Sequence, residues 1–319
     1  MRETLEIKLI LCPIDFSEFS VSAYRHALSL AEHYQAKLVA QHVVELWRHP
    51  AADFVASAGL YEEYSQALSE SGKKQLQEFV KNHTHDEIQP ELVVQTGVAA
   101  DSILSFARLQ KADVIVMGTH GRRGFDRLML GSVTDRVMRS APCPVLAESK
   151  PPHDSVAAGK ERGHVHHLSR ILFCADFSEN SDRALKYAIS ATAEYDAELT
   201  LLHVLEGGSS PAKTEEDRAA AAERLDQLIP PEGRKTLKIK TAVRIGKPYA
   251  QITQLALETQ IDLVTMGVRG RGDLDVSVFG STTLSGDAVG ILPRSCRPFI
   301  RRTQVVKSGK VVTKAERTP

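Results

Sequence analysis

Short continuous apolar runs alternate along this chain with longer segments whose apolar residues have helical spacing. Residues 8–14 and 38–44 are nearly unbroken apolar runs, as expected for strands that are covered on both faces. Between them, residues 20–34 place apolar side chains three or four positions apart, which predicts an amphipathic helix. Strand, helix and strand at this spacing predict a βαβ unit with a right-handed crossover in a parallel sheet.

The whole pattern occurs twice. The first strand and the aspartate that ends it return at an offset of 161 residues, from Asp15 to Asp176. A glycine-rich segment after the fourth predicted strand returns at an offset of 149 residues, from Gly118 to Gly267. The offset falls because the second copy is 12 residues shorter between its second and third strands. The chain therefore predicts two tandem domains of about 150 residues each, a common domain size.

We predict an α/β fold with two tandem Rossmann-like domains, each an open five-stranded parallel sheet of order 3-2-1-4-5 with helices on both faces. The predicted boundaries are 1–148 for the first domain, 149–167 for a linker, 168–302 for the second domain and 303–319 for a flexible basic tail. In the first domain, strands are expected at 8–14, 38–44, 91–95, 114–117 and 144–147, and helices at 20–34, 61–81 and 100–109. In the second, a strand is expected from Ile171 to Asp176, further strands at 199–206, 238–244 and 298–301, and helices at 181–195, 214–228 and 249–258.

The fifth strand of each domain would be an exposed edge, which must be paired or covered. We expect residues 144–147 to pair with residues 298–301 of the same chain, giving an intramolecular pseudo-dimer. Association of two chains into a homodimer is left open.

Charge and composition narrow the class of partner. The 40 basic residues balance 40 acidic ones, so neither nucleic acid nor a membrane surface is indicated. No run approaches the roughly 18 apolar residues of a membrane span, and the start of the sequence lacks the apolar core of a signal peptide. We expect a cytoplasmic protein. The four cysteines follow the repeat, which predicts buried, reduced thiols at Cys12, Cys143, Cys174 and Cys296.

The glycine-rich segment after the fourth strand is typical of a loop that holds phosphate, and we name it the cradle. Glycines let backbone N–H groups approach an anion, and the first amides of a helix carry the positive end of its dipole. A single copy of the spacing fits an ordinary strand-to-helix turn equally well, but here the spacing is duplicated. The first cradle has Gly118, Gly121, Gly131 and Ser132, and the second has Gly267, Gly270, Gly280 and Ser281.

A ligand of an open parallel sheet lies beyond the carboxyl ends of the strands where the strand order reverses, here between strands one and four. Asp15 ends strand one and Gly118 ends strand four, so a carboxylate faces a phosphate loop. A nucleotide suits that pair. Asp15 would accept from the adenine amino group or the ribose hydroxyls, the backbone near Val43 would border the base, and the cradle glycines with Ser132 and Thr134 would hold the phosphates.

Signatures of catalysis are absent from the sequence. Neither domain has a Gly-x4-Gly-Lys-Ser/Thr loop, a Ser-His-Asp signature or paired catalytic carboxylates. His120 has the chemistry of an acid or a base, but a phosphate contact is favoured, and His42 and His203 are expected to be structural. The linker contains four histidines that could bind zinc or nickel: His153, His164, His166 and His167. A solvated linker is favoured, so no metal site is predicted there.

The same residues resemble a known family. The cradle spacing, together with Cys12-Pro13-Ile14-Asp15-Phe16-Ser17, His42-Val43-Val44-Glu45 and Ala141-Pro142-Cys143-Pro144-Val145, is similar to that of the ATP-binding universal stress proteins. Two copies in one chain resemble the tandem form of that family, over about residues 5–148 and 168–302. The resemblance implies binding of an adenine nucleotide, ATP with or without Mg²⁺. It also implies a role in stress survival, where members of that family often act as regulators with little catalytic activity.

The predicted nucleotide contacts follow from the motif positions and their neighbours in the same segments. In the first domain they are Pro13, Ile14, Asp15, Val43, Met117, Gly118, His120, Gly121, Arg123, Gly131, Ser132, Val133 and Thr134. In the second domain they are Cys174, Ala175, Asp176, Val204, Gly267, Arg269, Gly270, Gly280, Ser281, Thr282 and Thr283.

The two cradles are not equivalent. Residues 119–130 carry three arginines and one aspartate, whereas residues 268–279 carry two arginines and two aspartates. The first domain should therefore attract a polyphosphate more strongly. The second domain also departs from the motif at Cys174, Ala175 and Arg269, and the helix expected after its cradle is interrupted by Gly286, Gly290 and Pro293.

Three functions are compatible with these residues. The favoured one is a nucleotide-binding regulatory protein, in which bound ATP or AMP orders the cradle loops and alters a surface that an unidentified protein partner reads. The second is a slow ATP hydrolase or phosphotransferase that uses His120 and the cradle arginines. The third is an interaction or chaperone-like scaffold whose second domain binds a ligand other than a nucleotide.

Overall fold

The computed structural model describes residues 6–46, 60–84, 88–119, 131–148, 168–206, 211–267 and 289–293. We call residues 6–148 the first half and residues 168–293 the second half. The first half contains β1 (Leu9–Pro13), α1 (Glu18–Tyr34), β2 (Lys37–Val44), α3 (Tyr61–His83), β3 (Glu91–Thr96), α4 (Ala99–Gln110), β4 (Val114–Gly118), α5 (Ser132–Ser140) and β5 (Val145–Glu148). The second half contains β6 (Arg170–Cys174), α6 (Glu179–Glu194), β7 (Glu198–Leu205), α7 (Pro211–Gln227), α8 (Pro231–Thr236), β8 (Lys238–Ile245), α9 (Pro248–Glu258), β9 (Leu263–Gly267) and β10 (Val289–Pro293).

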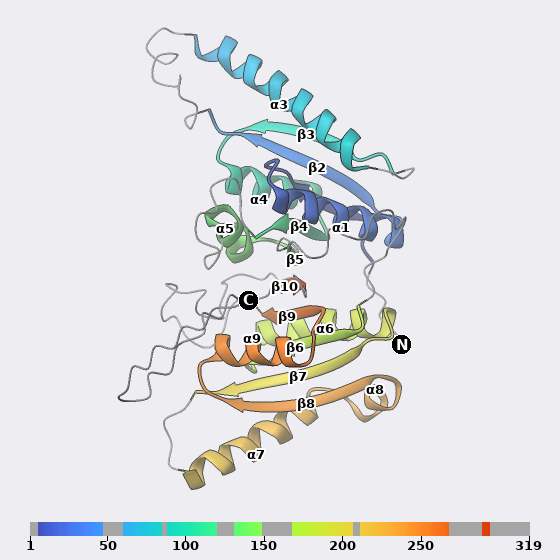
Figure 1. The fold of residues 1–319 in the computed structure, drawn as a ribbon, viewed down its shortest axis with the longest axis vertical. Coiled ribbons are helices and arrows are strands. Elements are labelled where there is room, and N and C mark those ends of the chain that lie inside the picture. Colours follow the sequence, from blue (N-terminus) through green and yellow to red (C-terminus); the bar gives the residue numbers. More distant parts are fainter. Residues whose placement is uncertain are drawn as a thin grey trace, which may run out of the picture.

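Ten strands form one continuous sheet in the order β3-β2-β1-β4-β5-β10-β9-β6-β7-β8 (Figure 1). The five strands of the first half are parallel and follow the predicted order 3-2-1-4-5. The strands β8, β7, β6 and β9 are also parallel and have the same order. The predicted α/β fold with tandem Rossmann-like halves is confirmed.

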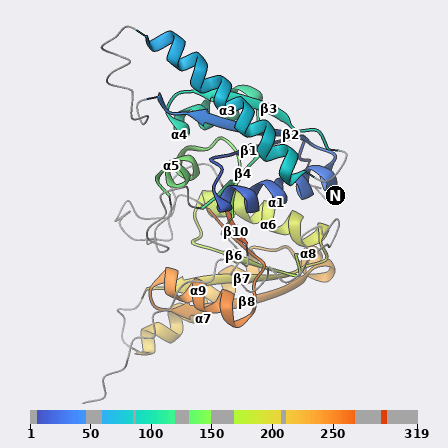
Figure 2. The same cartoon turned by 45° about the horizontal axis from the view of Figure 1, so that its top comes forward.

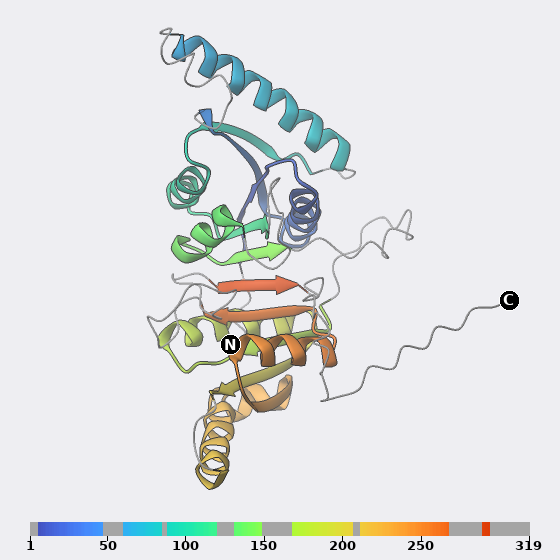
Figure 3. The same ribbon diagram turned by 60° about the vertical axis from the view of Figure 1, so that its left-hand side comes forward.

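The strand that joins the two halves is not the predicted one. Strand β10 pairs in parallel with β5, with Gly290 opposite Val145, and in antiparallel fashion with β9, with Gly290 opposite Met266 (Figure 3). The edge of β5 is thus covered by the same chain, as expected, but by residues 289–293. The predicted partner, residues 298–301, lies outside the described residues, and the fifth strand position of the second half is taken by an antiparallel strand.

Alternating strand residues divide the core into two layers, because successive side chains of a strand point to opposite faces of a sheet. Ile10 and Cys12 face a core under α1 and α3, whereas Leu11 faces a core under α4 and α5. The first core continues into the second half through Ile171 and Phe173, so helices α1 and α6 cover the same face of the long sheet. Helix α9 packs on the other face, over Leu172.

The prediction of buried, reduced thiols is confirmed in part. Cys12 and Cys143 are buried, Cys174 is partly exposed, and all three are free thiols. Burial raises the pKa of Cys143 to about 12 and also raises that of Cys12, so both remain protonated at neutral pH. Cys296 lies outside the described residues.

The carboxyl ends of α1 and α6 meet where the two halves join (Figure 2). His33 Nε2 donates to Glu194 Oε1 at 2.6 Å, and the Tyr34 hydroxyl donates to Glu194 Oε2 at 2.6 Å. The His33 ring also stacks on Tyr195, with ring centroids 5.4 Å apart. The offset of 161 residues makes Glu194 the counterpart of His33 and Tyr195 the counterpart of Tyr34. Equivalent positions of the two halves therefore contact each other with complementary groups.

Exchange of these two side chains tests whether they contribute to the pairing of the halves. His33→Glu places two carboxylates together and should lower the free energy of unfolding of the full chain by about 1 kcal/mol, because the pair is only partly exposed. The double variant His33→Glu with Glu194→His restores the complementary pair in the reverse sense and should recover most of the loss. Urea unfolding monitored by circular dichroism measures both. A double variant no more stable than His33→Glu would show that the pair does not matter.

Candidate functional site

The end of β1 forms a strained turn that holds Asp15 at the carboxyl edge of the sheet. Phe16 has a φ of 64°, in the left-handed region that non-glycine residues rarely adopt. One carboxylate oxygen of Asp15, Oδ1, accepts from the Ser17 N–H at 3.0 Å and from the Ser20 hydroxyl. Ser17 in turn is the N-cap of α1 and accepts from the Ser20 N–H at 3.2 Å. The aspartate is therefore fixed in position by its own turn.

A histidine on the neighbouring strand braces this turn. His42 Nδ1 donates to the Ile14 carbonyl at 2.8 Å, and its ring packs on Phe16 with centroids 4.5 Å apart. The second half repeats the arrangement, since His203 Nδ1 donates to the Ala175 carbonyl at 2.7 Å. The expectation that His42 and His203 are structural is confirmed. Their function is to hold the residue before each strand-end aspartate.

The first cradle glycine is required by packing against α1. A Cβ added at Gly118 would lie 2.6 Å from the Phe19 Cβ and 3.0 Å from the Phe19 backbone carbon. At Gly267, the same addition would meet the Asn180 and Ser181 backbones at 2.8 Å. Only glycine lets the end of the fourth strand come this close to the start of the first helix. The structure thus gives Gly118 a packing role that the sequence did not reveal, and its contact with an anion stays a prediction.

The two ends of the first cradle are bonded to each other and to β5. The Thr119 N–H donates to the Glu148 carbonyl at 2.7 Å, and the Gly131 N–H donates to the Thr119 carbonyl at 2.8 Å. The Thr134 hydroxyl donates to the Gly118 carbonyl at 2.8 Å. That hydroxyl therefore ties α5 to β4. The cradle segment between these ends, including His120, Gly121 and Arg123, lies outside the described residues.

The amino end of α5 faces this crevice with the features of an anion site. Gly131 is its N-cap and makes no side-chain cap hydrogen bond to the first turn of the helix. The acidic residue of that turn, Asp135, is held by Arg139 through two hydrogen bonds of 2.8 Å each. Asp135 also raises the pKa of Arg139, so the guanidinium stays charged and offsets the carboxylate. The backbone amides and the helix dipole then favour a negative ligand.

Several predicted contacts can reach a ligand only through their backbone. The side chains of Ile14 and Met117 are buried in the core, with 3% and 4% of their surface exposed. Val43 and Val133 are partly buried against the core under α4 and α5. Pro13 and Asp15 are half-buried and Ser132 is exposed, so these side chains remain accessible at the crevice.

The described part of the second site repeats the first. The Asp176 Oδ1 accepts from the Ser178 N–H at 3.0 Å and from the Ser178 hydroxyl at 2.7 Å. Phe177 has a φ of 57°, so the strained turn is also repeated. The other predicted contacts within the described residues, Cys174, Ala175, Val204 and Gly267, lie at the ends of β6, β7 and β9. The remaining ones lie outside the described residues: Arg269, Gly270, Gly280, Ser281, Thr282 and Thr283.

Sequence reasoning missed a role for Glu45, the residue after β2. Its Oε1 accepts from the Ala99 N–H at 3.1 Å and so satisfies the first amide of α4. At the matching position of the second half, helix α9 begins with Pro248, which has no N–H to satisfy. The counterpart of Glu45 is Glu206, which is exposed. The difference is visible in the sequence once both helix starts are known.

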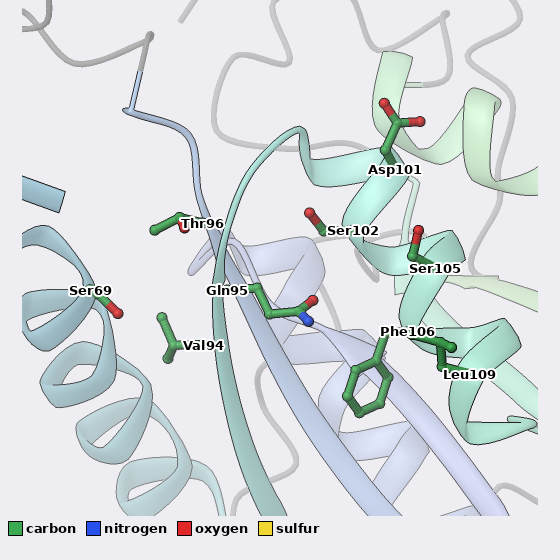
Figure 4. Close-up of a pocket in the computed structure, with 9 residues that line it drawn as sticks. All are labelled: Ser69, Val94, Gln95, Thr96, Asp101, Ser102, Ser105, Phe106 and Leu109. Atoms are coloured by element: carbon green, nitrogen blue, oxygen red, sulfur yellow. The ribbon is translucent and has the colours of Figure 1, made fainter. Parts of the chain in front are cut away.

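A pocket of about 510 Å³ lies away from the crevice, at the edge of the sheet (Figure 4). The amide of Gln95 points toward α4, and Ser69 contributes from α3 on the other side of β3. Gln95 also accepts from the buried amide of Gln41 at 2.7 Å. None of the predicted nucleotide contacts lines this pocket, which is formed by Ser69, Val94, Gln95, Thr96, Asp101, Ser102, Ser105, Phe106 and Leu109.

Comparison with known proteins agrees with the repeated geometry. The model of the universal stress protein family matches residues 6–147 and again residues 167–285. The chain belongs to the universal stress protein family. Among the family's members, a universal stress protein of Methanocaldococcus jannaschii is 37% identical over 146 residues, which are 45% of this chain and 83% of that protein.

Other members match both halves. A universal stress protein of Mycolicibacterium smegmatis is 25% identical over 287 residues, which are 86% of this chain and 91% of that protein. The crystal structure of a universal stress protein from Archaeoglobus fulgidus covers 91% of this chain and 99% of its own, with a TM-score of 0.52 and 20% identity. The latter likeness shows the fold. Among the described helices, none combines the length and apolarity needed to cross a membrane.

The close approach at Gly118 gives a direct test of the packing. Gly118→Ala should lower the free energy of unfolding by about 1–3 kcal/mol, because its Cβ would press on the Phe19 backbone. Gly233→Ala, inside helix α8, is a matched control. The added Cβ would meet a movable side-chain atom, Ile229 Cγ2, at 3.1 Å. That change should be neutral or stabilising. Urea unfolding of both variants decides the matter, and equal stabilities would contradict the packing argument.

Proposed function

We propose that this universal stress protein is a regulatory protein that binds an adenine nucleotide in the crevice between β1 and β4 of its first half. The main support is the arrangement at that crevice. Asp15, which accepts from the Ser17 N–H, lies at the end of β1. The N-terminus of α5, which has no side-chain cap, lies beyond β4. The proposed ligand is ATP, with or without Mg²⁺, and the proposed domains span residues 1–148 and 168–302.

The described groups suit the two ends of a nucleotide. On one side, Asp15 offers a carboxylate for the hydroxyls of a ribose or the amino group of adenine, because such groups donate and a carboxylate only accepts. On the other side, the first amides of α5 donate to an anion. The backbone at Pro13, Ile14 and Val43 would border the base. We assign the phosphates to Gly118, Gly131, Ser132, Val133 and the intervening cradle with His120, Gly121 and Arg123.

A regulatory role is favoured over catalysis because the two ionisable side chains described at the site, Asp15 and His42, both serve the turn, Asp15 by accepting from the Ser17 N–H. His42 uses its Nδ1 to brace the Ile14 carbonyl, so it serves the turn. Nucleotide binding would then act by ordering the cradle between Thr119 and Gly131, two residues that are bonded to each other. That segment would form the surface that a protein partner reads.

Isothermal calorimetry of the full chain with ATP tests the proposal. The wild type should bind, and Asp15→Asn should weaken binding about tenfold, because the amide keeps one oxygen for the turn but replaces the other by a donor. Asp176→Asn is the matched control, since it makes the same change in the second half. It should leave the stronger binding step unaltered.

Two results would contradict this assignment. Absence of binding up to millimolar ATP would remove the proposed function. An equal loss of affinity in Asp15→Asn and Asp176→Asn would remove the preference for the first half. Release of ADP at a steady rate in the same samples would favour the hydrolase that the sequence left open.

A further inference from the structure

A buried pair of ionisable side chains lies beneath the first cradle. His26, in α1, is 6% exposed, and Glu148, the last residue of β5, is 4% exposed. The Nδ1 of His26 hydrogen-bonds to Oε1 of Glu148. The neighbours of His26 along the helix, Ala23 and Ala27, belong to the apolar core. Removing a polar pair from water is unfavourable, and apolar residues of similar volume often stabilise a core as well or better. The pair therefore calls for a role beyond stability.

The backbone of the same glutamate holds one end of the cradle, and that end holds the other. The Glu148 carbonyl accepts from the Thr119 N–H at 2.7 Å, and the Thr119 carbonyl accepts from the Gly131 N–H at 2.8 Å. Thr119 is 3% exposed, so this connection is shielded from water. Gly131 is the N-cap of α5. Glu148 thus connects helix α1, through its side chain, with Thr119, through its backbone, and Thr119 passes the connection to Gly131 at the start of α5.

The second half lacks this histidine. The offset of 161 residues places Tyr187 at the position of His26, in the corresponding helix α6. Helix α6 still packs on β9 as α1 packs on β4, with Gly267 in the place of Gly118. The histidine and glutamate are a feature of the half whose cradle carries the larger positive charge.

Cys12, on β1, is an ionisable group close to the pair. Burial together with the Glu148 charge raises the pKa of its thiol, so the thiol is neutral. The imidazole of His26 hydrogen-bonds to the Glu148 carboxylate, and loss of that bond would remove a partner from a buried acceptor.

We propose that His26 and Glu148 are positioning residues for the first cradle. The hydrogen bond from His26 fixes Glu148, and Glu148 in turn sets the positions of Thr119 and Gly131. These positions set the affinity for the anionic end of the nucleotide. This inference rests on the proposed nucleotide site. It predicts that a substitution of His26 in α1 acts through Glu148, without contact with the ligand. The substitution should change the hydrogen-exchange protection of the cradle ends and the affinity for ATP together.

The test compares two variants of His26 in the full chain. His26→Leu removes the donor, whereas His26→Asn keeps an N–H near the position of the imidazole Nδ1. Amide hydrogen exchange followed by mass spectrometry measures the peptides that contain Thr119 and Gly131. His26→Leu should speed exchange there about tenfold and weaken ATP binding by a similar factor, the size expected for one lost hydrogen bond to a charged group. His26→Asn should keep both quantities within about threefold of the wild type.

A control variant separates positioning from general loss of stability. Asp113→Ala acts at the amino end of the sheet, where Asp113 Oδ2 accepts from the Lys8 and Leu9 N–H groups at 2.8 and 2.9 Å. Exchange is compared at matched free energies of unfolding, set by adding urea to the more stable sample. Asp113→Ala should leave the cradle ends as protected as they are in the wild type.

The outcomes are distinct. Unchanged exchange at Thr119 and Gly131 in His26→Leu, or equal effects of Leu and Asn, would overturn the inference, and so would an equal rise in Asp113→Ala. Faster exchange with unchanged ATP affinity would overturn its link to binding. If His26→Leu does not fold, Glu148→Gln, which is isosteric and weakens the same bond, must raise exchange at the cradle ends or the inference fails. Failure of the wild type to bind ATP would count against the proposed function instead.

Discussion

The close contact between the end of the fourth strand and the start of the first helix constrains the rest of this structure. In both halves a glycine without a side chain lets these two elements touch, at Gly118 and at Gly267. The contact brings the turn that holds the aspartate beside the beginning of the cradle. Because a side chain here would push the helix away, the crevice between strands one and four depends on it. The duplicated chemistry at the strand ends follows from a duplicated packing contact.

Much of the fold could be predicted from the sequence because the signals were local and repeated. Continuous apolar runs located the parallel strands, and helical spacing over residues 20–34 located the helix that the structure begins at Glu18. The offset between the copies then supported each assignment twice. Burial of Ile14 and Met117 could also have been predicted, since both lie in strands or directly after one where alternate residues enter the core.

Other features depend on contacts between distant parts of the chain. The packing of Gly118 on Phe19 was not predicted, because Phe19 is far from Gly118 in the sequence and leaves no local sign. Strand β10 was missed because Gly290 and Pro293 were interpreted as interruptions of a helix, whereas the structure pairs Gly290 with Val145 of β5 and Pro293 with Leu263 of β9. The short helix α8 carries a proline at its first position, a start signal that was overlooked. The hydrogen bond from Ala99 to Glu45 required knowledge of which helix begins beside β2.

The direction of β10 determines how the two cradles are displayed. This strand is parallel to β4 and β5 but antiparallel to β9, so the fourth strands of the two halves run in opposite directions and their carboxyl ends lie at opposite edges of the sheet (Figure 3). Gly118 and Gly267, the last residues of these two strands, therefore lie at opposite edges of the sheet. The tandem chain would thus present its two sites at different edges of one sheet, and unequal occupancy would make those edges chemically different.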